Sequence, residues 1–323
     1  MRHYTIFGSP NDYLVASYKD TDKIPGAVYK PEYLPGTPKI IKKLHTAHCL
    51  IPFSVKNNMP FRKLWYKRYF SEPYKEGDEY IFVFFYFWYP IFENGFLDYL
   101  RKTYPGCKCV LFLCDIACAR KLDMEKQKKL FDHIMVFERN FAKEHGIAHY
   151  PLVYSDFRHD APPEGKDIDL LFVGWAKGRY QLLKQIYDRL TAEGVNCQFY
   201  LTKLDEEVPP ESGIHTADWV PYPQYISLMK RAKCLLDIIP PNTDCCTLRA
   251  SEAMSYNCKI LTNNTHIVNE AFYDPDNVSA YASPEEIDVE FIKRQYVVPE
   301  RDEHVKNMGP GALLQYLDKT LYK

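Results

Sequence analysis

Short apolar runs with the character of buried strands alternate with helical segments along most of the chain. In the first part, strands are expected at residues 3–8, 80–88, 107–114, 134–138 and 148–153. Helices are expected at residues 94–103, 124–132 and 139–145. Strands and helices that alternate in this way predict a parallel sheet with helices on both faces.

A polar stretch at residues 155–166 interrupts the alternation. It contains Pro162, Pro163 and Gly165, which favour a linker between domains. The alternation then restarts, with strands expected at 169–173, 197–201, 234–238, 259–262 and 278–281 and helices at 179–193, 222–232, 247–255 and 267–272. The predicted fold class is therefore α/β, with two Rossmann-like doubly wound domains whose strand ends face a cleft. The predicted domains are residues 1–155 and 156–306, and fold analogy predicts that a last helix in 307–323 returns to the first domain.

Composition excludes several classes of protein. The net charge of −1 provides no overall field that would attract nucleic acid. The longest apolar run, residues 80–92, is too short to span a bilayer as a helix and is interrupted by Pro90. The ten cysteines show no paired zinc-binding spacing, and Met1 leads directly into a predicted strand. We expect a cytoplasmic protein with reduced thiols.

The first candidate binding segment is LLFVGWAKGR, residues 170–179, in which a buried strand ends in a glycine turn and a helix follows. Gly174 permits close approach of a backbone, and the helix N-terminus attracts anions. Lys177 and Arg179 add two positive charges, so the segment suits a diphosphate. The alternative is a simple strand–turn–helix connection with solvated basic side chains.

The second candidate segment is DCCTLRASE, residues 244–252, which follows another predicted strand. It opens a helix with the hydroxyl of Thr247 and the guanidinium of Arg249, both suitable phosphate partners. Glu252 lies about two turns after Asp244, and its carboxylate can accept both hydroxyls of a ribose. The alternative for Arg249 and Glu252 is an exposed pair within one helix.

These residues carry a resemblance to a family. The D-x7-E spacing in DCCTLRASEAMSYNCKILTNN resembles the Glu-x7-Glu region of GT-B glycosyltransferases, and the TLR-x-x-E-A block and FVG-x-x-KGR turn resemble a bacterial capsule and lipopolysaccharide biosynthesis group. The resemblance covers residues 134–296. It implies that Lys177 and Arg179 hold the donor diphosphate, with further contacts from Thr247, Leu248 and Arg249. It also implies that Glu252 binds the ribose and that the base lies near Val220 and Tyr222. Asp244 in place of the first glutamate, and the adjacent Cys245-Cys246, depart from the family pattern.

Residues 33–71 contain eight Lys or Arg and no acidic residue. The residues expected to contact an acceptor or a membrane are Lys42, Lys43, Arg62, Lys63, Lys67 and Arg68. Aromatic residues interleave with the last of these, which suits an anionic membrane surface. The resemblance implies a lipid-linked acceptor here, whereas the alternative is a solvated basic face.

Asp115, at the end of a predicted strand, is the expected catalytic base, with His45 and His48 as alternatives. The competing interpretation of Asp115 is a helix N-cap. The three D-x-D triplets do not follow apolar strands, so no metal site and no cofactor beyond the co-substrate are expected.

Together these features predict a metal-independent transferase that moves a sugar from a nucleotide diphosphate sugar to a surface-glycan acceptor. The expected partners are the nucleotide sugar, a glycan or lipid-linked acceptor and the inner face of the cell membrane, without nucleic acid. A sugar-nucleotide epimerase or hydrolase of the same fold, and a non-catalytic binding homologue, are the alternative functions.

Overall fold

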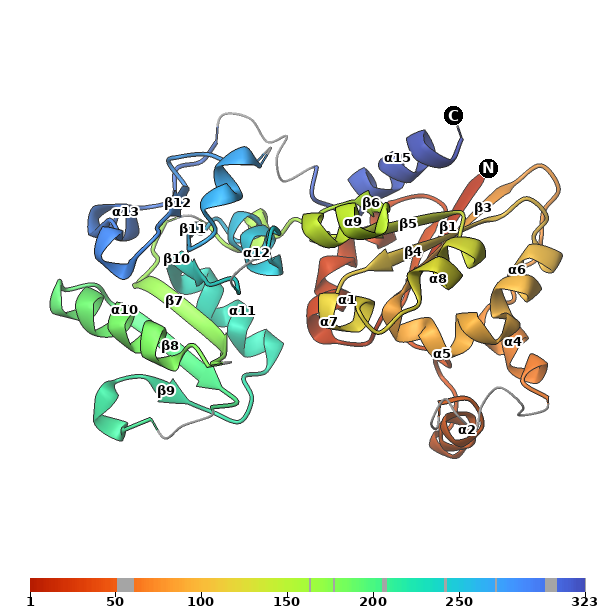
Figure 1. The fold of residues 1–323 in the computed structure, drawn as a ribbon, viewed down its shortest axis with the longest axis horizontal. Helices are drawn as coiled ribbons and strands as arrows, with labels where there is room; N and C mark the ends of the chain where they lie inside the picture. The colour runs from red at the N-terminus through yellow and green to blue at the C-terminus, as the bar shows by residue number, and fades with distance from the viewer. Residues whose placement is uncertain are drawn as a thin grey trace. The chain divides into compact units, whose positions relative to one another are not determined.

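The computed structural model describes residues 1–50, 61–162, 164–176, 178–204, 208–240, 243–270, 272–299 and 307–322. The chain divides into two compact units: Met1–Tyr150 with Leu313–Lys323, and Pro151–Ala312. Each unit contains one six-stranded parallel sheet with helices on both faces (Figure 1). The predicted fold class, two parallel doubly wound α/β domains, is confirmed.

Unit 1 has the strand order β2-β1-β3-β4-β5-β6. The strands are β1 (Arg2–Phe7), β2 (Ala27–Lys30), β3 (Glu79–Phe85), β4 (Lys108–Leu113), β5 (His133–Val136) and β6 (Ala148–His149). Its helices are α1 (Asp12–Ser17), α2 (Lys39–His45), α4 (Lys63–Tyr69), α5 (Tyr89–Ile91), α6 (Leu97–Thr103), α7 (Ile116–Ala119), α8 (Met124–Leu130), α9 (Arg139–His145) and most of α15 (Pro310–Leu321). The sequence did not predict β2, which pairs in parallel with β1.

The sheet of unit 1 is buried on both faces, as a parallel sheet requires. In β3, Phe82 and Phe84 join a large aromatic core, and the alternating Ile81, Val83 and Phe85 are buried on the other side. This explains why residues 80–85 form an uninterrupted apolar run. From α15, Asp318 accepts a hydrogen bond from the Tyr4 hydroxyl of β1 at 2.5 Å, so the last helix packs on unit 1.

Unit 2 has the strand order β12-β11-β10-β7-β8-β9. The strands are β7 (Ile168–Trp175), β8 (Cys197–Thr202), β9 (His215–Thr216), β10 (Ala232–Asp237), β11 (Lys259–Thr262) and β12 (Val278–Ala280). The helices are α10 (Tyr180–Ala192), α11 (Tyr222–Arg231), α12 (Leu248–Ser255) and α13 (Val289–Lys293). A helix was expected at residues 267–272, but the chain forms a 3-10 turn at Thr265–Asn269 instead.

Alternate residues of the unit 2 strands enter two separate cores. Leu170 and Phe172 of β7 pack with α10 and α13, whereas Leu171 and Val173 pack with α11 and α12. Two helix layers therefore cover the two faces of this sheet. The 3.6-residue period predicted for α10 is present, since Tyr180, Leu183, Ile186 and Leu190 are its buried residues.

The boundary between the units lies between Tyr150 and Pro151, and the polar stretch predicted as a linker belongs to unit 2. The Phe157 amide donates to Ser255 Oγ at 2.9 Å, and the buried Lys166 ammonium donates to the Tyr256 carbonyl at 2.8 Å. These bonds fix polar residues to the folded body, which composition alone could not indicate.

Candidate functional site

The strand order of unit 2 reverses between β7 and β10. From β7 the chain runs outward to β8 and β9, then returns to place β10 on the other side of β7. At such a switch point, the connections that follow the two strands lead to opposite faces of the sheet and leave a crevice at the carboxyl ends. The first candidate binding segment spans the end of β7 and the connection after it, and the second lies in the connection after β10 and the start of α12.

Arg249 bridges the ends of β7 and β10. Its guanidinium donates to the Leu236 carbonyl at 3.1 Å and to the Val173 carbonyl at 2.5 Å. Thr247 caps the N-terminus of α12 by accepting a hydrogen bond from the Arg249 amide at 3.1 Å, which places the arginine in the first turn. A Cβ atom added to Gly174 would lie 3.5 Å from Arg249 Nη2, so the predicted glycine lies beside the guanidinium.

Asp237, the last residue of β10, lies buried in this cluster. Its carboxylate accepts hydrogen bonds from the Thr247 hydroxyl at 2.9 Å and the Thr262 hydroxyl at 3.3 Å. Burial raises the pKa of Asp237, although nearby Arg249 and the Thr247 hydrogen bond act in the opposite direction. The carboxylate thus holds the capping residue of α12 and lies within electrostatic range of Arg249 on the same helix.

Asp237 predicts a pH dependence of stability. Because its pKa is raised in the folded protein, the folded state binds more protons than the unfolded chain in a range that begins near the ordinary value of 3.8. The free energy of unfolding of the wild type, relative to Asp237→Asn, should therefore decrease as pH rises from about 4 through the folded pKa. Urea unfolding of both proteins across this range measures the difference, and an increase with pH would contradict the assignment.

Arg179 approaches the same end of β10 from the other segment. As the N-cap residue of α10, it donates hydrogen bonds to the Trp175 carbonyl at 3.0 Å, the Ala176 carbonyl at 3.2 Å and the Ile238 carbonyl. Burial and the neighbouring positive charge of Arg249 lower the pKa of Arg179. Two guanidiniums from the two predicted segments therefore lie within electrostatic range of each other, where an anion would relieve their repulsion.

Glu252 lies one turn further along α12 and is buried. Its two carboxylate oxygens accept hydrogen bonds from the Tyr222 hydroxyl at 2.7 Å and the Tyr225 hydroxyl at 3.0 Å. The Tyr222 hydroxyl also lies 2.6 Å from that of Tyr154. Burial raises the pKa of Glu252, opposed by Arg249. The side chain is held from α11 and is not the exposed intrahelical partner of Arg249 considered as an alternative.

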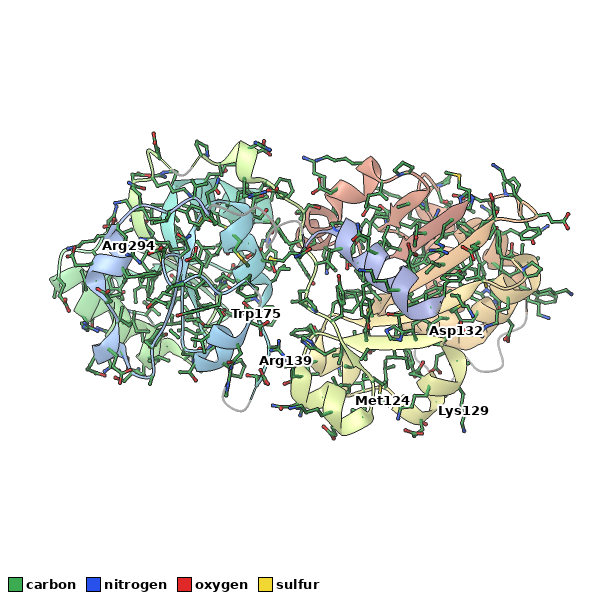
Figure 2. All side chains as sticks on the ribbon, turned by 90° about the horizontal axis from the view of Figure 1, so that it is seen from above. Met124, Lys129, Asp132, Arg139, Trp175 and Arg294 are labelled. Carbon is green, nitrogen blue, oxygen red and sulfur yellow. The ribbon has the colours of Figure 1, made fainter. Side chains whose placement is uncertain are left out.

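Most of the other predicted donor-site residues lie near the N-termini of α11 and α12. Leu248 is the first residue of α12, Tyr222 is the first residue of α11, and Val220 is buried just before it. Asp244 is half-buried in the connection after β10, and Lys177 lies outside the described residues. Trp175 lies at the carboxyl end of β7 and is partly exposed (Figure 2). The Lys203 ammonium lies 3.4 Å from its ring centre.

Unit 1 has a cavity at its own switch point. Its strand order reverses between β1 and β3, and a cavity of about 380 Å³ opens where these strands and β2 end. The residues that line it are Gly8, Ser9, Pro10, Pro31, Glu32, Tyr33, Leu34, Lys42, His45, Thr46 and Phe87. A Cβ atom on Gly8 would lie 2.2 Å from the Tyr29 ring, so a larger residue at this turn would have to displace the tyrosine. Within the cavity wall, Lys42 pairs with Glu32 at 2.6 Å.

The predicted catalytic and basic residues have separate positions in unit 1. Asp115 is the N-cap of α7 and accepts a hydrogen bond from the Cys118 amide at 3.0 Å, so the capping role is present. His45 is buried in the cavity wall, and burial, aided by His48, lowers its pKa to about 4. Lys43, Lys63, Lys67 and Arg68 are exposed on α2 and α4, and Arg62 is half-buried.

Among the residues that the structure describes, no group of three or more His, Cys, Asp or Glu side chains is arranged to hold a metal ion. None of their helices combines the length and the apolar character needed to cross a bilayer.

The segment that carries Arg179, Asp237, Arg249 and Glu252 also has a recognisable sequence. Residues 179–307 match the Glycosyl transferase-like family. The glycosyl transferase-like segment begins at Arg179 and makes up less than half of the chain, all of it in unit 2. It therefore contains the second candidate binding segment whole and the end of the first. No curated protein matches the chain significantly.

Solved structures of glycosyltransferases are similar to the whole chain at low sequence identity. "Spinosyn Forosaminyltransferase SpnP" is 10% identical, with 99% of each chain covered and a TM-score of 0.42. "Alpha-glucosyltransferase in complex with UDP-glucose and DNA containing an abasic site" is 10% identical, with 99% of this chain and 91% of that chain covered and a TM-score of 0.49. The strand order of the two sheets establishes the fold independently of these similarities.

Sequence reasoning missed three side chains that complete the cluster in the glycosyl transferase-like segment. Asp237 was available as the one acidic residue of an apolar strand that ends beside the site. Tyr225 lies one turn after Tyr222 on α11, but only the packing of α11 on α12 shows that it bonds Glu252. Tyr281 follows β12, and its buried hydroxyl has no hydrogen-bond partner among the described residues.

Proposed function

We propose that this chain transfers a sugar from a nucleotide diphosphate sugar to a glycan acceptor. The observation that carries the proposal is the convergence of Arg179 and Arg249 on the end of β10, at the switch point of a glycosyl transferase-like unit. Each guanidinium has five N–H donors, and those not used on backbone carbonyls can bind phosphate oxygens. The N-terminus of α12 adds its partial positive charge.

In this proposal the donor diphosphate lies between the two arginines. Transfer of the sugar leaves an additional negative charge on the nucleotide diphosphate, and Arg179, Arg249 and the predicted Lys177 would stabilise it without a metal ion. Glu252, held by the tyrosine hydroxyls of α11, would accept hydrogen bonds from the ribose. Val220 and Tyr222 would lie against the base.

The proposed acceptor is a surface glycan, such as that of a capsule, O-antigen or exopolysaccharide, built on a lipid-linked carrier at the inner face of the cell membrane. The cavity of unit 1 supports an acceptor site because it combines the Glu32–Lys42 pair with the rings of Tyr33 and Phe87. A volume of about 380 Å³ falls in the range of small-molecule pockets. Asp115 is the proposed proton acceptor, and His45, uncharged at neutral pH, is the alternative.

Nucleotide release from UDP-, GDP- and dTDP-sugars by the purified chain tests this function. We expect release from one donor class to increase on addition of membranes that carry the acceptor. Release that membranes do not increase would indicate a hydrolase. Conversion of the donor into an isomeric nucleotide sugar without net release would indicate an epimerase, and donor binding without either reaction would indicate a non-catalytic homologue. Arg231→Ala is the matched control, because Arg231 is an exposed arginine of the same unit that pairs with Asp167.

A further inference from the structure

Two short helices of unit 1 expose large apolar side chains. On α2, Ile40 is 68% exposed and Leu44 is 56% exposed, and their i, i+4 spacing places them on one side of the helix. Phe61, just before α4, is 74% exposed, and Leu64 on α4 is 72% exposed. Ile40, Phe61 and Leu64 are the three most exposed large apolar side chains among the described residues.

The same two helices are anchored to unit 1 by their other sides. His45 of α2 is buried and lies 2.6 Å from the Tyr69 hydroxyl of α4, and its ring packs edge-on against Trp65. The Trp65 indole N–H also donates to His48 at 2.8 Å. The two helices thus contact each other through their inner sides, and α2 lies at the margin of unit 1 (Figure 1). The exposed apolar residues are therefore not needed for this packing.

The helices that expose these apolar side chains also carry basic residues. Four lysines are exposed on the same helices: Lys39, Lys43, Lys63 and Lys67. No residue of α2 or α4 is acidic. Among the residues that the structure describes, neither Lys43 nor Lys67 has an acidic partner within ion-pair distance. By contrast, Lys42 on the inner side pairs with Glu32 in the cavity wall.

We propose that the outer faces of α2 and α4 dock on an anionic lipid bilayer. Their four apolar side chains would enter the headgroup boundary, and their lysines would lie at the level of the lipid phosphates. A nucleic acid would bind the lysines through its phosphates but would leave the four exposed apolar side chains without a partner. These apolar side chains therefore favour a bilayer over a nucleic acid. Membrane docking deepens the proposed function, and it rests on that function for the lipid-linked nature of the acceptor.

Docking in this way would place the cavity of unit 1 next to the membrane. The cavity is lined by Lys42 and His45 on the inner side of α2 and by Thr46 in the turn that follows. The docking face is the outer side of the same helix. An acceptor held in the bilayer by a lipid chain would then present its sugar to the cavity without leaving the membrane.

Vesicle sedimentation of the full chain tests the docking face. Vesicles of phosphatidylcholine with about one third phosphatidylglycerol should bind the protein, whereas phosphatidylcholine alone should bind it at least about tenfold less. Lys43→Glu with Lys67→Glu should weaken binding to the anionic vesicles by at least about tenfold, since each basic residue contributes roughly fivefold. Ile40→Ser with Leu44→Ser should weaken it by about tenfold through lost apolar insertion.

Matched variants serve as controls. Lys121→Glu with Lys129→Glu changes two exposed lysines elsewhere in unit 1, one of them on α8 (Figure 2), and Val298→Ser changes an exposed apolar residue of unit 2. Both should bind vesicles as the wild type does. Equal weakening by the control variants, or no binding to anionic vesicles, would overturn the proposal.

Nucleic acid is the remaining outcome. If random-sequence duplex DNA binds and Ile40→Ser with Leu44→Ser leaves that binding unchanged, while vesicles fail to bind, the surface belongs to nucleic acid and the proposal is wrong. Nucleotide binding by the same variants, measured by calorimetry, distinguishes failure of the docking proposal from failure of the proposed function. The docking face lies outside unit 2, so its variants should bind nucleotide as the wild type does even if the docking proposal is wrong. Circular dichroism confirms that each variant is folded.

Discussion

Arg249→Ala should weaken binding of a nucleoside diphosphate by about tenfold to a hundredfold and lower the free energy of unfolding by about 2–4 kcal/mol. The first effect is the loss of a charged hydrogen-bond donor to the diphosphate. The second arises because the guanidinium bonds to Val173 of β7 and Leu236 of β10 and compensates the buried Asp237. Calorimetric titration and urea unfolding measure the two quantities separately.

Arg249→Lys distinguishes the charge from the geometry of the guanidinium. Lysine keeps the positive charge but cannot bridge two carbonyls and a phosphate with a planar fork, so its affinity should lie between those of the wild type and the alanine variant. Arg231→Ala should change neither quantity beyond about 0.5 kcal/mol. Full nucleotide affinity in Arg249→Ala would exclude the arginine from the donor site.

Glu252→Ala should have the second large effect, a loss of nucleoside affinity of about 1–3 kcal/mol. Because Glu252 is proposed to bind the ribose hydroxyls, the wild type should prefer a ribonucleotide over its 2′-deoxy counterpart. The variant should lose most of that preference, since the carboxylate that distinguishes the two sugars is gone. Calorimetric titration with UDP and dUDP measures the preference in both proteins.

The same substitution leaves the Tyr222 and Tyr225 hydroxyls without their carboxylate acceptor and should also lower stability by about 2–4 kcal/mol. Glu252→Gln keeps one acceptor oxygen and most of the side-chain volume, so it should retain more stability than alanine while still losing ribose preference. An unchanged preference in both variants would remove Glu252 from the ribose site.

The parallel sheets were predictable because their strands are buried on both faces. Such strands appear in the sequence as short continuous apolar runs, as in residues 80–85 and 170–173, and helices with a 3.6-residue period separate them. Strand β2 was not predictable, because each residue of Ala27–Lys30 is only half-buried and the strand is defined by its pairing with β1. The polar residues 155–166 were mistaken for a linker, because their hydrogen bonds to unit 2 depend on the tertiary fold.

The candidate site was predictable in its charged residues and less so in their partners. Arg179 and Arg249 follow glycine and threonine turns after buried strands, and parallel strands bring such turns to one edge of a sheet. The hydroxyl partners of Glu252 depend on how α11 packs against α12, which no spacing along the chain indicates. The helix-capping role of Asp115 was foreseen as the alternative to catalysis, and its N-cap bond is present.

A crystal structure of the chain with its preferred nucleotide, chosen by thermal shift among UDP, GDP, dTDP and CMP, tests the central claim most directly. We predict that the phosphates lie between the guanidiniums of Arg179 and Arg249, at the N-terminus of α12, with the ribose beside Glu252. A nucleotide bound elsewhere, with no phosphate oxygen in hydrogen-bond range of either arginine, would contradict the account.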